Sequence, residues 1–227
     1  MSKLSKGKPL VIFGLGQIAE MAWHCFTRDS EYEVVAFTAD REFLGGLKTK
    51  FGLPVIPFND IPVRFPPAVN KMFVAIAYGK LNQLRTNTVA RVAEVGYSCV
   101  NYVSSKATVA GEIVPDSNCF ILELNNIQPF SKIGSNVWLW SGNHVGHHAE
   151  IENNCFIASH AVISGSVKIG EYTFVGVNAT IRDNVIVGAR NVIGAGALIL
   201  EDTEVSQVFL AQKAEASRVP SHRLRGI

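Results

Sequence analysis

Histidines are the residues of this sequence whose type and spacing best suit catalysis. Four of the six lie within seventeen residues, at His144, His147, His148 and His160. An imidazole titrates near neutral pH, so it can take a proton from an attacking amine or hydroxyl. Acyl transfer from a thioester needs such a base, together with backbone amides that hold the oxyanion. The simpler alternative is a group of surface histidines in polar turns, but the clustering favours a catalytic site.

A glycine-rich turn near the start of the chain suits a phosphate group. Gly14-Leu15-Gly16-Gln17-Ile18-Ala19 fits the pattern G-x-G-x-x-A between an expected strand and an expected helix. Glycines let backbone amides approach a phosphate, and the start of a helix favours its charge. Asp40 follows the next expected strand, where an acid could bind a ribose hydroxyl. The expected domain is half the size of a full dinucleotide fold, which favours the diphosphate of a nucleotide-linked substrate over NAD, and a turn without ligand stays open.

A six-residue repeat must position the histidines. Fifteen aliphatic residues recur at this spacing without a break. Neither a helix nor an ordinary sheet has this period. They are Ile121, Ile127, Ile133, Leu139, Val145, Ile151, Ile157, Ile163, Ile169, Val175, Ile181, Val187, Ile193, Ile199 and Val205.

The repeat predicts a left-handed parallel β-helix. Each unit is one short strand and one corner, three units make a coil of 18 residues, and fifteen units make five coils. Glycine often follows the aliphatic residue, where we expect it to turn the corner. His147 then lies at an outer corner, and Gly165, one coil later, leaves room for a ligand. An accidental spacing within a β-sandwich is the alternative.

The first third of the chain predicts a small α/β domain. Expected strands cover Lys8–Phe13, Glu33–Phe37, Met72–Ala77 and Tyr97–Val103, and expected helices cover residues 17–27 and 81–95. Gly45–Pro67 reads as irregular. Strand and helix alternate, which is typical of a parallel sheet. We therefore expect a Rossmann-like domain over residues 1–104 and the β-helix over residues 105–227.

Composition excludes several classes of function. The net charge is +2 and the basic residues are scattered, so no nucleic-acid partner is expected. No apolar run approaches the length of a membrane span, so we expect no membrane association and a cytoplasmic protein. The four cysteines show no C-x-x-C spacing and are typical of a reducing compartment.

Taken together, the chain resembles the sialic acid O-acetyltransferase-like sugar acyltransferases, which include N-acetyltransferases of the bacillosamine pathway. The segment that carries the histidine is Val145-Gly146-His147-His148-Ala149-Glu150-Ile151. The resemblance implies that His147 is the general base and that His148 replaces the acid which usually orients it. It implies that Ser164 and Gly165 face an acyl-CoA, and that Lys213 contacts a CoA phosphate.

The resemblance also implies a second substrate and an assembly. Gly14, Gly16 and Gln17 would hold the phosphates of a nucleotide-linked amino sugar, and Asp40 would lie near its uracil or ribose. Such proteins are homotrimers with active sites between subunits.

Three functions follow from this reading. The first is transfer of an acyl group, from acetyl-CoA, to the amine of a nucleotide-linked amino sugar. The second is transfer to a sugar hydroxyl by the same site, and the third is a non-catalytic trimeric scaffold that binds nucleotide sugars. Zinc is the competing use of the histidines. A shared zinc site would need a further histidine upstream of His144, and His24 lies in the other domain, so no metal is expected.

Overall fold

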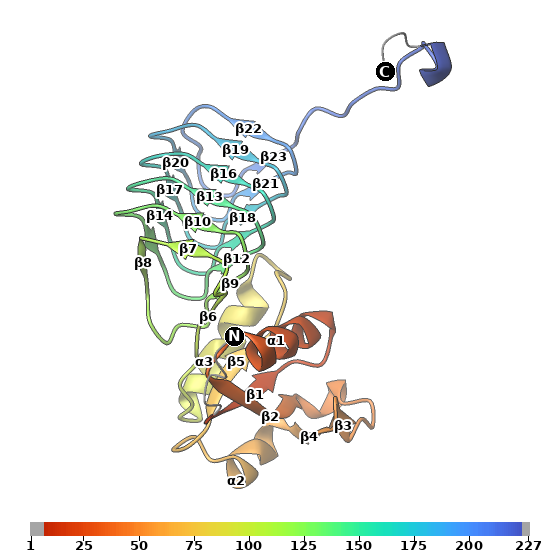
Figure 1. Ribbon diagram of the computed structural model, residues 1–227, viewed down its shortest axis with the longest axis vertical. Helices are drawn as coiled ribbons and strands as arrows, with labels where there is room; N and C mark the ends of the chain where they lie inside the picture. The colour runs from red at the N-terminus through yellow and green to blue at the C-terminus, as the bar shows by residue number, and fades with distance from the viewer. Residues whose placement is uncertain (1–6, 224–227) are drawn as a thin grey trace.

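The computed structural model describes residues 7–223. It consists of an N-terminal α/β domain and a three-sided parallel β-helix (Figure 1). None of the helices in this part of the chain is long and apolar enough to cross a bilayer.

Five strands and three helices make up the α/β domain. The sheet order is β3-β4-β2-β1-β5, and every neighbouring pair is parallel except β3 and β4. Leu10, Ile12, Phe37 and Phe73 are fully buried in its core. The elements are β1 (Lys8–Phe13), α1 (Gln17–Arg28), β2 (Tyr32–Ala39), β3 (Thr49–Lys50), β4 (Leu53–Pro57), α2 (Ile61–Arg64), β5 (Lys71–Val74) and α3 (Gln83–Glu94), with short 3-10 turns at Arg41–Phe43 and Phe58–Asp60.

Two expectations for this domain were wrong. The segment expected to be irregular contains β4, which Pro54 and Pro57 disguise because proline normally interrupts a strand. The strand expected over Tyr97–Val103 does not extend the sheet. Only Cys99 bridges to Met72 of β5, and Tyr102–Val103 (β6) pairs with Phe120–Ile121 of the β-helix. The chain therefore passes from one domain to the other within this segment.

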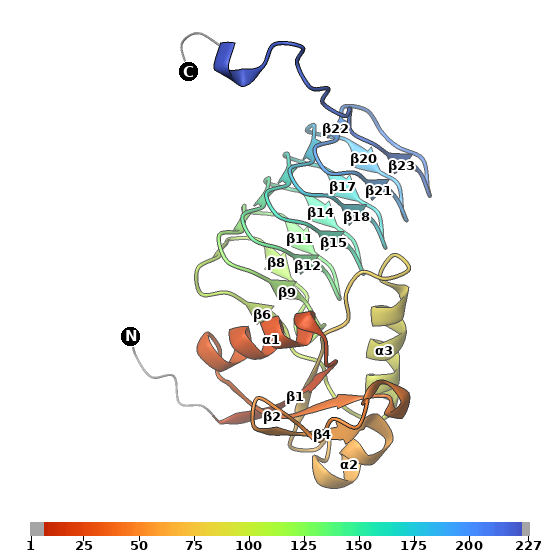
Figure 2. The same ribbon diagram turned by 90° about the vertical axis from the view of Figure 1, so that its right-hand side faces the viewer.

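The β-helix has three sheets of two-residue strands, in the arrangement expected of hexapeptide coils (Figure 2). Consecutive strands of a sheet are 18 residues apart, as in the pairing of Asn126 with His144. The first sheet contains β7 (Thr108–Val109), β10 (Asn126–Ile127), β13 (His144–Val145), β16 (Val162–Ile163), β19 (Thr180–Ile181) and β22 (Leu198–Ile199). The second contains β8 (Glu112–Ile113), β11 (Lys132–Ile133), β14 (Glu150–Ile151), β17 (Lys168–Ile169) and β20 (Ile186–Val187). The third contains β6, β9 (Phe120–Ile121), β12 (Trp138–Leu139), β15 (Phe156–Ile157), β18 (Phe174–Val175), β21 (Val192–Ile193) and β23 (Val208–Phe209).

The aliphatic repeat forms the core of this helix, with two corrections at its ends. Fourteen of the fifteen residues are buried together, whereas Val205 is 60% exposed. The last coil is two residues shorter, since Val192 pairs with Val208, and this moves Val205 out of register. At the other end Pro115 occupies the repeat position, so the first coil was missed. The helix has about six coils rather than five.

The turns lie two residues later than the sequence suggested. Positive φ angles recur every six residues, three after each aliphatic, as at Asn136, His148 and Asn154. The glycine directly after the aliphatic has a different reason. A Cβ on Gly146 would lie 2.6 Å from the backbone nitrogen of Gly165 in the next coil. Glycine is needed there because two coils approach closely, not because the chain turns.

The outward side chains give the three sheets different surfaces. The aromatic face carries Tyr102, Phe120, Trp138, Phe156 and Phe174, and the α/β domain packs on it through Phe73 and Tyr78. The charged face has Glu150 between Lys132 and Lys168, within 3.5 and 3.6 Å of their ammonium groups. The neutral face carries Thr108, Asn126, His144, Val162, Thr180 and Leu198.

A buried polar seam fixes helix α3 to the β-helix. The Arg85 side chain is fully buried, donates to the Asn136 side chain at 2.9 Å and backbone carbonyl at 3.0 Å, and stacks on Trp138. Thr86 donates to Asn154, one coil beyond Asn136. The two domains are therefore held in one orientation by directional contacts as well as by aromatic packing.

Candidate active site

His147 and His148 form a pair at the corner between the neutral and charged faces. Both side chains are exposed, and their Nδ1 atoms are 3.1 Å apart. The ring of Phe130 lies against His148, with centroids 4.8 Å apart. The Gln128 side chain accepts a hydrogen bond from the backbone amide of His147. The corner therefore holds two imidazoles in contact, as the spacing predicted.

Gly165 lies directly beside the His147 ring, one coil further along. A Cβ on Gly165 would fall 2.8 Å from His147 Cε1 and 2.9 Å from Nε2. The glycine leaves room for the imidazole itself, whereas the sequence suggested room for a ligand. Ser164 precedes it in the same turn, so the structure brings His147, His148, Ser164 and Gly165 together.

The amide of Gly165 is available as a donor. At this corner position the backbone N–H is not bonded to the next coil. In three other coils a side chain accepts from it, as Asn153 does from Ser135, Gln128 from His147 and Glu152 from Glu171. Within residues 7–223 no group accepts from Gly165. An unsatisfied amide beside an imidazole is a donor for an oxyanion.

The other two histidines of the sequence cluster lie elsewhere. His144 is on β13, on the neutral face. His160 is at the corner between the aromatic and neutral faces, where its ring lies over Gly142. The apparent cluster of four is thus one contacting pair and two separate side chains, because residues close in sequence fall on different sides of the coil. Among the described residues, no group of three or more histidine, cysteine or acidic side chains could hold a metal ion.

The glycine-rich turn lines a cavity of about 650 Å³ in the α/β domain. Gly14 has φ +130°, and a Cβ there would meet the Ala75 carbonyl at 2.7 Å. Gly16 precedes α1 and faces open space. Asp40 lines the same cavity, so three of the four predicted residues converge. Gln17 is exposed at the first turn of α1 and does not line it.

Helix α3 closes the other side of this cavity, which sequence reasoning missed. Arg91 pairs with both carboxylate oxygens of Asp40, and this hydrogen bonding lowers the pKa of Asp40. The helical spacing i, i+3, i+4, i+7 was a usable signal, because it places one row of α3 side chains along the cavity. These residues are Leu84, Asn87, Thr88 and Arg91.

Lys213 does not join the site within one chain. It lies in the exposed segment after β23, which runs away from the β-helix (Figure 1). A contact between Lys213 and a ligand at Gly165 therefore needs another copy or a different path of this segment.

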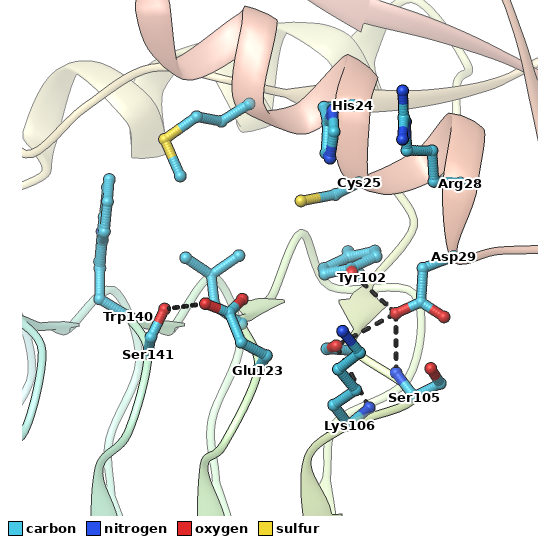
Figure 3. A pocket seen from close by; sticks show the side chains of 13 residues that line it. His24, Cys25, Arg28, Asp29, Tyr102, Ser105, Lys106, Glu123, Trp140 and Ser141 are labelled. Carbon is cyan, nitrogen blue, oxygen red and sulfur yellow. Dashed lines mark hydrogen bonds between the residues drawn. The ribbon is translucent and has the colours of Figure 1, made fainter.

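A larger cleft of about 840 Å³ lies between α1 and the first three coils, away from the predicted residues. Its charges balance, with Arg28 and Lys106 against Asp29 and Glu123. Figure 3 shows the two acids already in use. Asp29 accepts hydrogen bonds from Tyr102, Ser104 and Ser105, and Glu123 accepts one from Ser141. The cleft is therefore best understood as part of the junction between the domains.

Comparison with known protein families agrees with this architecture. A family model described as bacterial transferase hexapeptide (six repeats) matches residues 130–165 and 166–201. The chain is a hexapeptide-repeat protein. A comparison with curated protein sequences gives no match.

Solved hexapeptide-repeat structures share the fold over nearly the whole chain. The acetyltransferase domain of PglB from Neisseria gonorrhoeae, in complex with acetyl coenzyme A, is 23% identical with a TM-score of 0.79, covering 90% of this chain and 96% of that one. PerB from Caulobacter crescentus, in complex with CoA and GDP-perosamine, is 24% identical with a TM-score of 0.78, covering 89% and 94%. WeeI from Acinetobacter baumannii is 18% identical with a TM-score of 0.65, covering 88% and 94%. At these identities the likeness establishes the fold, including an α/β domain joined to the β-helix.

Proposed function

We propose that this protein is an acyl-CoA-dependent N-acyltransferase that uses acetyl-CoA and acts on a nucleotide-linked amino sugar. The observation that carries the proposal is the juxtaposition of the His147 imidazole with the unbonded Gly165 amide. A base and an oxyanion donor side by side are what acyl transfer requires. Two proteins of the same fold are named as complexes with CoA or acetyl coenzyme A, and one of these also holds GDP-perosamine.

The chemistry assigns one role to each residue. The sugar amine attacks the thioester carbonyl while His147 Nε2 takes a proton from the amine nitrogen. The Gly165 amide donates to the carbonyl oxygen as it becomes negative. The carbon–sulfur bond then breaks, and the departing CoA thiolate recovers the proton from His147. Ser164 lies in the turn that would face the acyl-CoA. An amine is a better nucleophile than a hydroxyl, which favours N- over O-transfer at a site without a carboxylate partner for the base.

The glycine-rich cavity suits the nucleotide part of the acceptor. Backbone amides at the start of α1 can receive a diphosphate, since no side chain caps this helix. Asp40 and Arg91 offer an acceptor and donors for a base or ribose. The parallel strand order β4-β2-β1-β5 supports a Rossmann-like reading of this domain.

The two half-sites lie on opposite sides of one chain, which supports a homotrimer. The α/β domain covers the aromatic face, and His147 lies at the corner opposite that face. A second copy can bring its cavity to this corner. The neutral face is the β-helix surface with neither a charged row nor a covering domain, so we assign it to contacts between copies. Lys213 of another copy could then reach the CoA.

The test is to incubate the protein with acetyl-CoA and a panel of nucleotide-linked amino sugars, and to follow release of free thiol. We expect turnover with at least one amino sugar and none with the matching hydroxyl sugar. His147→Asn should lower the rate by about 10²–10⁴-fold, with an unchanged oligomer. Turnover of only the hydroxyl sugar would make the protein an O-acyltransferase, and an unchanged rate in His147→Asn would remove His147 as the base.

A further inference from the structure

His148 occupies the place of the acid in the resembled family, and the structure shows what it can do there. Its Nδ1 lies 3.1 Å from Nδ1 of His147, with the two rings nearly perpendicular at 85°. A contact between two ring nitrogens is a hydrogen bond only if one nitrogen carries a proton and the other does not. The pair therefore links the tautomer of one ring to the protonation of the other.

Only one arrangement of protons leaves a working base. For Nε2 of His147 to accept a proton, its Nδ1 must carry the hydrogen and donate it to His148. His148 must then be neutral, with its own hydrogen on Nε2. In the reverse arrangement His148 donates, the hydrogen of neutral His147 moves to Nε2, and the lone pair that would take the substrate proton is lost.

The surroundings let His148 control this choice. Its ring is held against Phe130, and its backbone amide donates to the Pro129 carbonyl. Across residues 7–223, the groups in contact with the pair are Gln128, Phe130, Gly165 and the backbone of Pro129 and Ser166, none of them charged. No neighbouring carboxylate or cation therefore competes to set which nitrogen is protonated.

We propose that His148 is a positioning residue that holds His147 in the Nδ1-protonated tautomer, and that proton uptake by His148 switches the base off in acid. This inference rests on the proposed function, which it deepens by assigning a regulation to the same site. A protonated His148 can only donate from Nδ1, so His147 must accept there and present N–H to the substrate. One proton taken up by the pair inactivates it, wherever that proton first binds.

The variants at position 148 separate acceptor, charge and shape. His148→Asn keeps an acceptor, since the asparagine oxygen can occupy the place of Nδ1, and asparagine tolerates the φ of +59°. His148→Asp has the same shape with a negative charge. His148→Leu offers no acceptor. We expect His148→Asn to stay within about threefold of the native rate and His148→Leu to fall about a hundredfold, because the tautomer is no longer fixed.

The pH profile is the readout that a merely structural role would not move. The carboxylate of His148→Asp stabilises protonated His147, so the acid limb of kcat/KM should move up by about one pH unit relative to the native protein. In His148→Asn the limb should not move up. An acid limb at the same pH in all three forms would overturn the proposal.

A measurement without substrate separates this proposal from the proposed function. Nitrogen-15 NMR of histidine-labelled full-length protein reports which ring nitrogen carries the hydrogen. At pH 8 we expect His147 to be protonated at Nδ1 in the native and His148→Asn forms, and to show a mixture in His148→Leu. The same tautomer in all forms would overturn the proposal. The expected tautomers in a protein that transfers no acyl group would overturn only the proposed function.

Discussion

Gly165 stands one coil beyond His147, and the missing Cβ of this glycine leaves the space that the imidazole fills. The same corner contains a second close approach, between Gly146 and the backbone of Ser164 and Gly165. The two glycines differ in what they make room for. One accommodates a side chain that can rotate, and the other accommodates a backbone that cannot move without displacing a coil.

Gly165→Ala should therefore damage catalysis and spare the fold. The new methyl group would push the His147 ring aside, and a displacement of about 1 Å costs on the order of a hundredfold in rate. We expect kcat to fall by about this factor while the melting temperature stays within a few degrees. The matched control is Gly146→Ala, which should lose about 1–3 kcal/mol of stability because the methyl meets backbone atoms. Equal losses of stability in both variants would contradict this assignment.

Arg91 should set both the affinity of the nucleotide cavity and the ionisation of Asp40. In Arg91→Gln the cavity loses a charged donor, and we expect KM for the nucleotide sugar to rise about tenfold with little change in kcat. A change in kcat alone would place Arg91 with the reacting groups instead.

The pKa of Asp40 gives a second measurement on the same pair. Arg91 lowers it in the folded protein, so the carboxylate contributes stability that is present above its ordinary pKa and is lost as the pH falls through the folded value. Carbon-13 titration should show Asp40 ionised further into acid in the native protein than in Arg91→Gln. Identical titration curves would mean that the pair does not persist in solution.

Arg85 should be a large contributor to the junction between the domains. Its removal leaves two buried Asn136 oxygens short of a donor and opens a cavity beside Trp138. We expect Arg85→Ala to lower the free energy of unfolding by about 3 kcal/mol. Arg85→Met retains most of the packing and should lose less. Denaturant unfolding measures both, and an Arg85→Ala variant as stable as the native protein would show that the seam is not needed.

The sequence predicted the β-helix because its information is local and repeated. Each aliphatic residue marks an inward position independently of the others, so Val145 and Ile163 identify a coil without knowledge of the rest. The ends were mispredicted where the repeat breaks, at Pro115 and after Ile199. The glycine after each aliphatic was recognised, but its physical reason is a contact with the next coil, which no local pattern displays.

The candidate sites were predictable to different extents. His147 and Gly165 are 18 residues apart, so the period alone placed them together. The pairing of Asp40 with Arg91 depends on how α3 packs across the sheet, and nothing near either residue in sequence specifies it. His160 was grouped with His147 by proximity along the chain, although the corners of the coil separate them.

Mixing of inactive subunits tests most directly that His147 of one copy serves the cavity of another. One variant is His147→Asn, and the other is Gly16→Trp, whose side chain has open space to fill and should block the cavity. Each alone should be inactive. After mild dissociation and reassembly at equal ratio, we predict that about a quarter of the native activity returns, since that share of sites combines an intact histidine with an intact cavity. No recovery in verified mixed trimers would contradict the account, because the base and the cavity would then have to belong to the same chain.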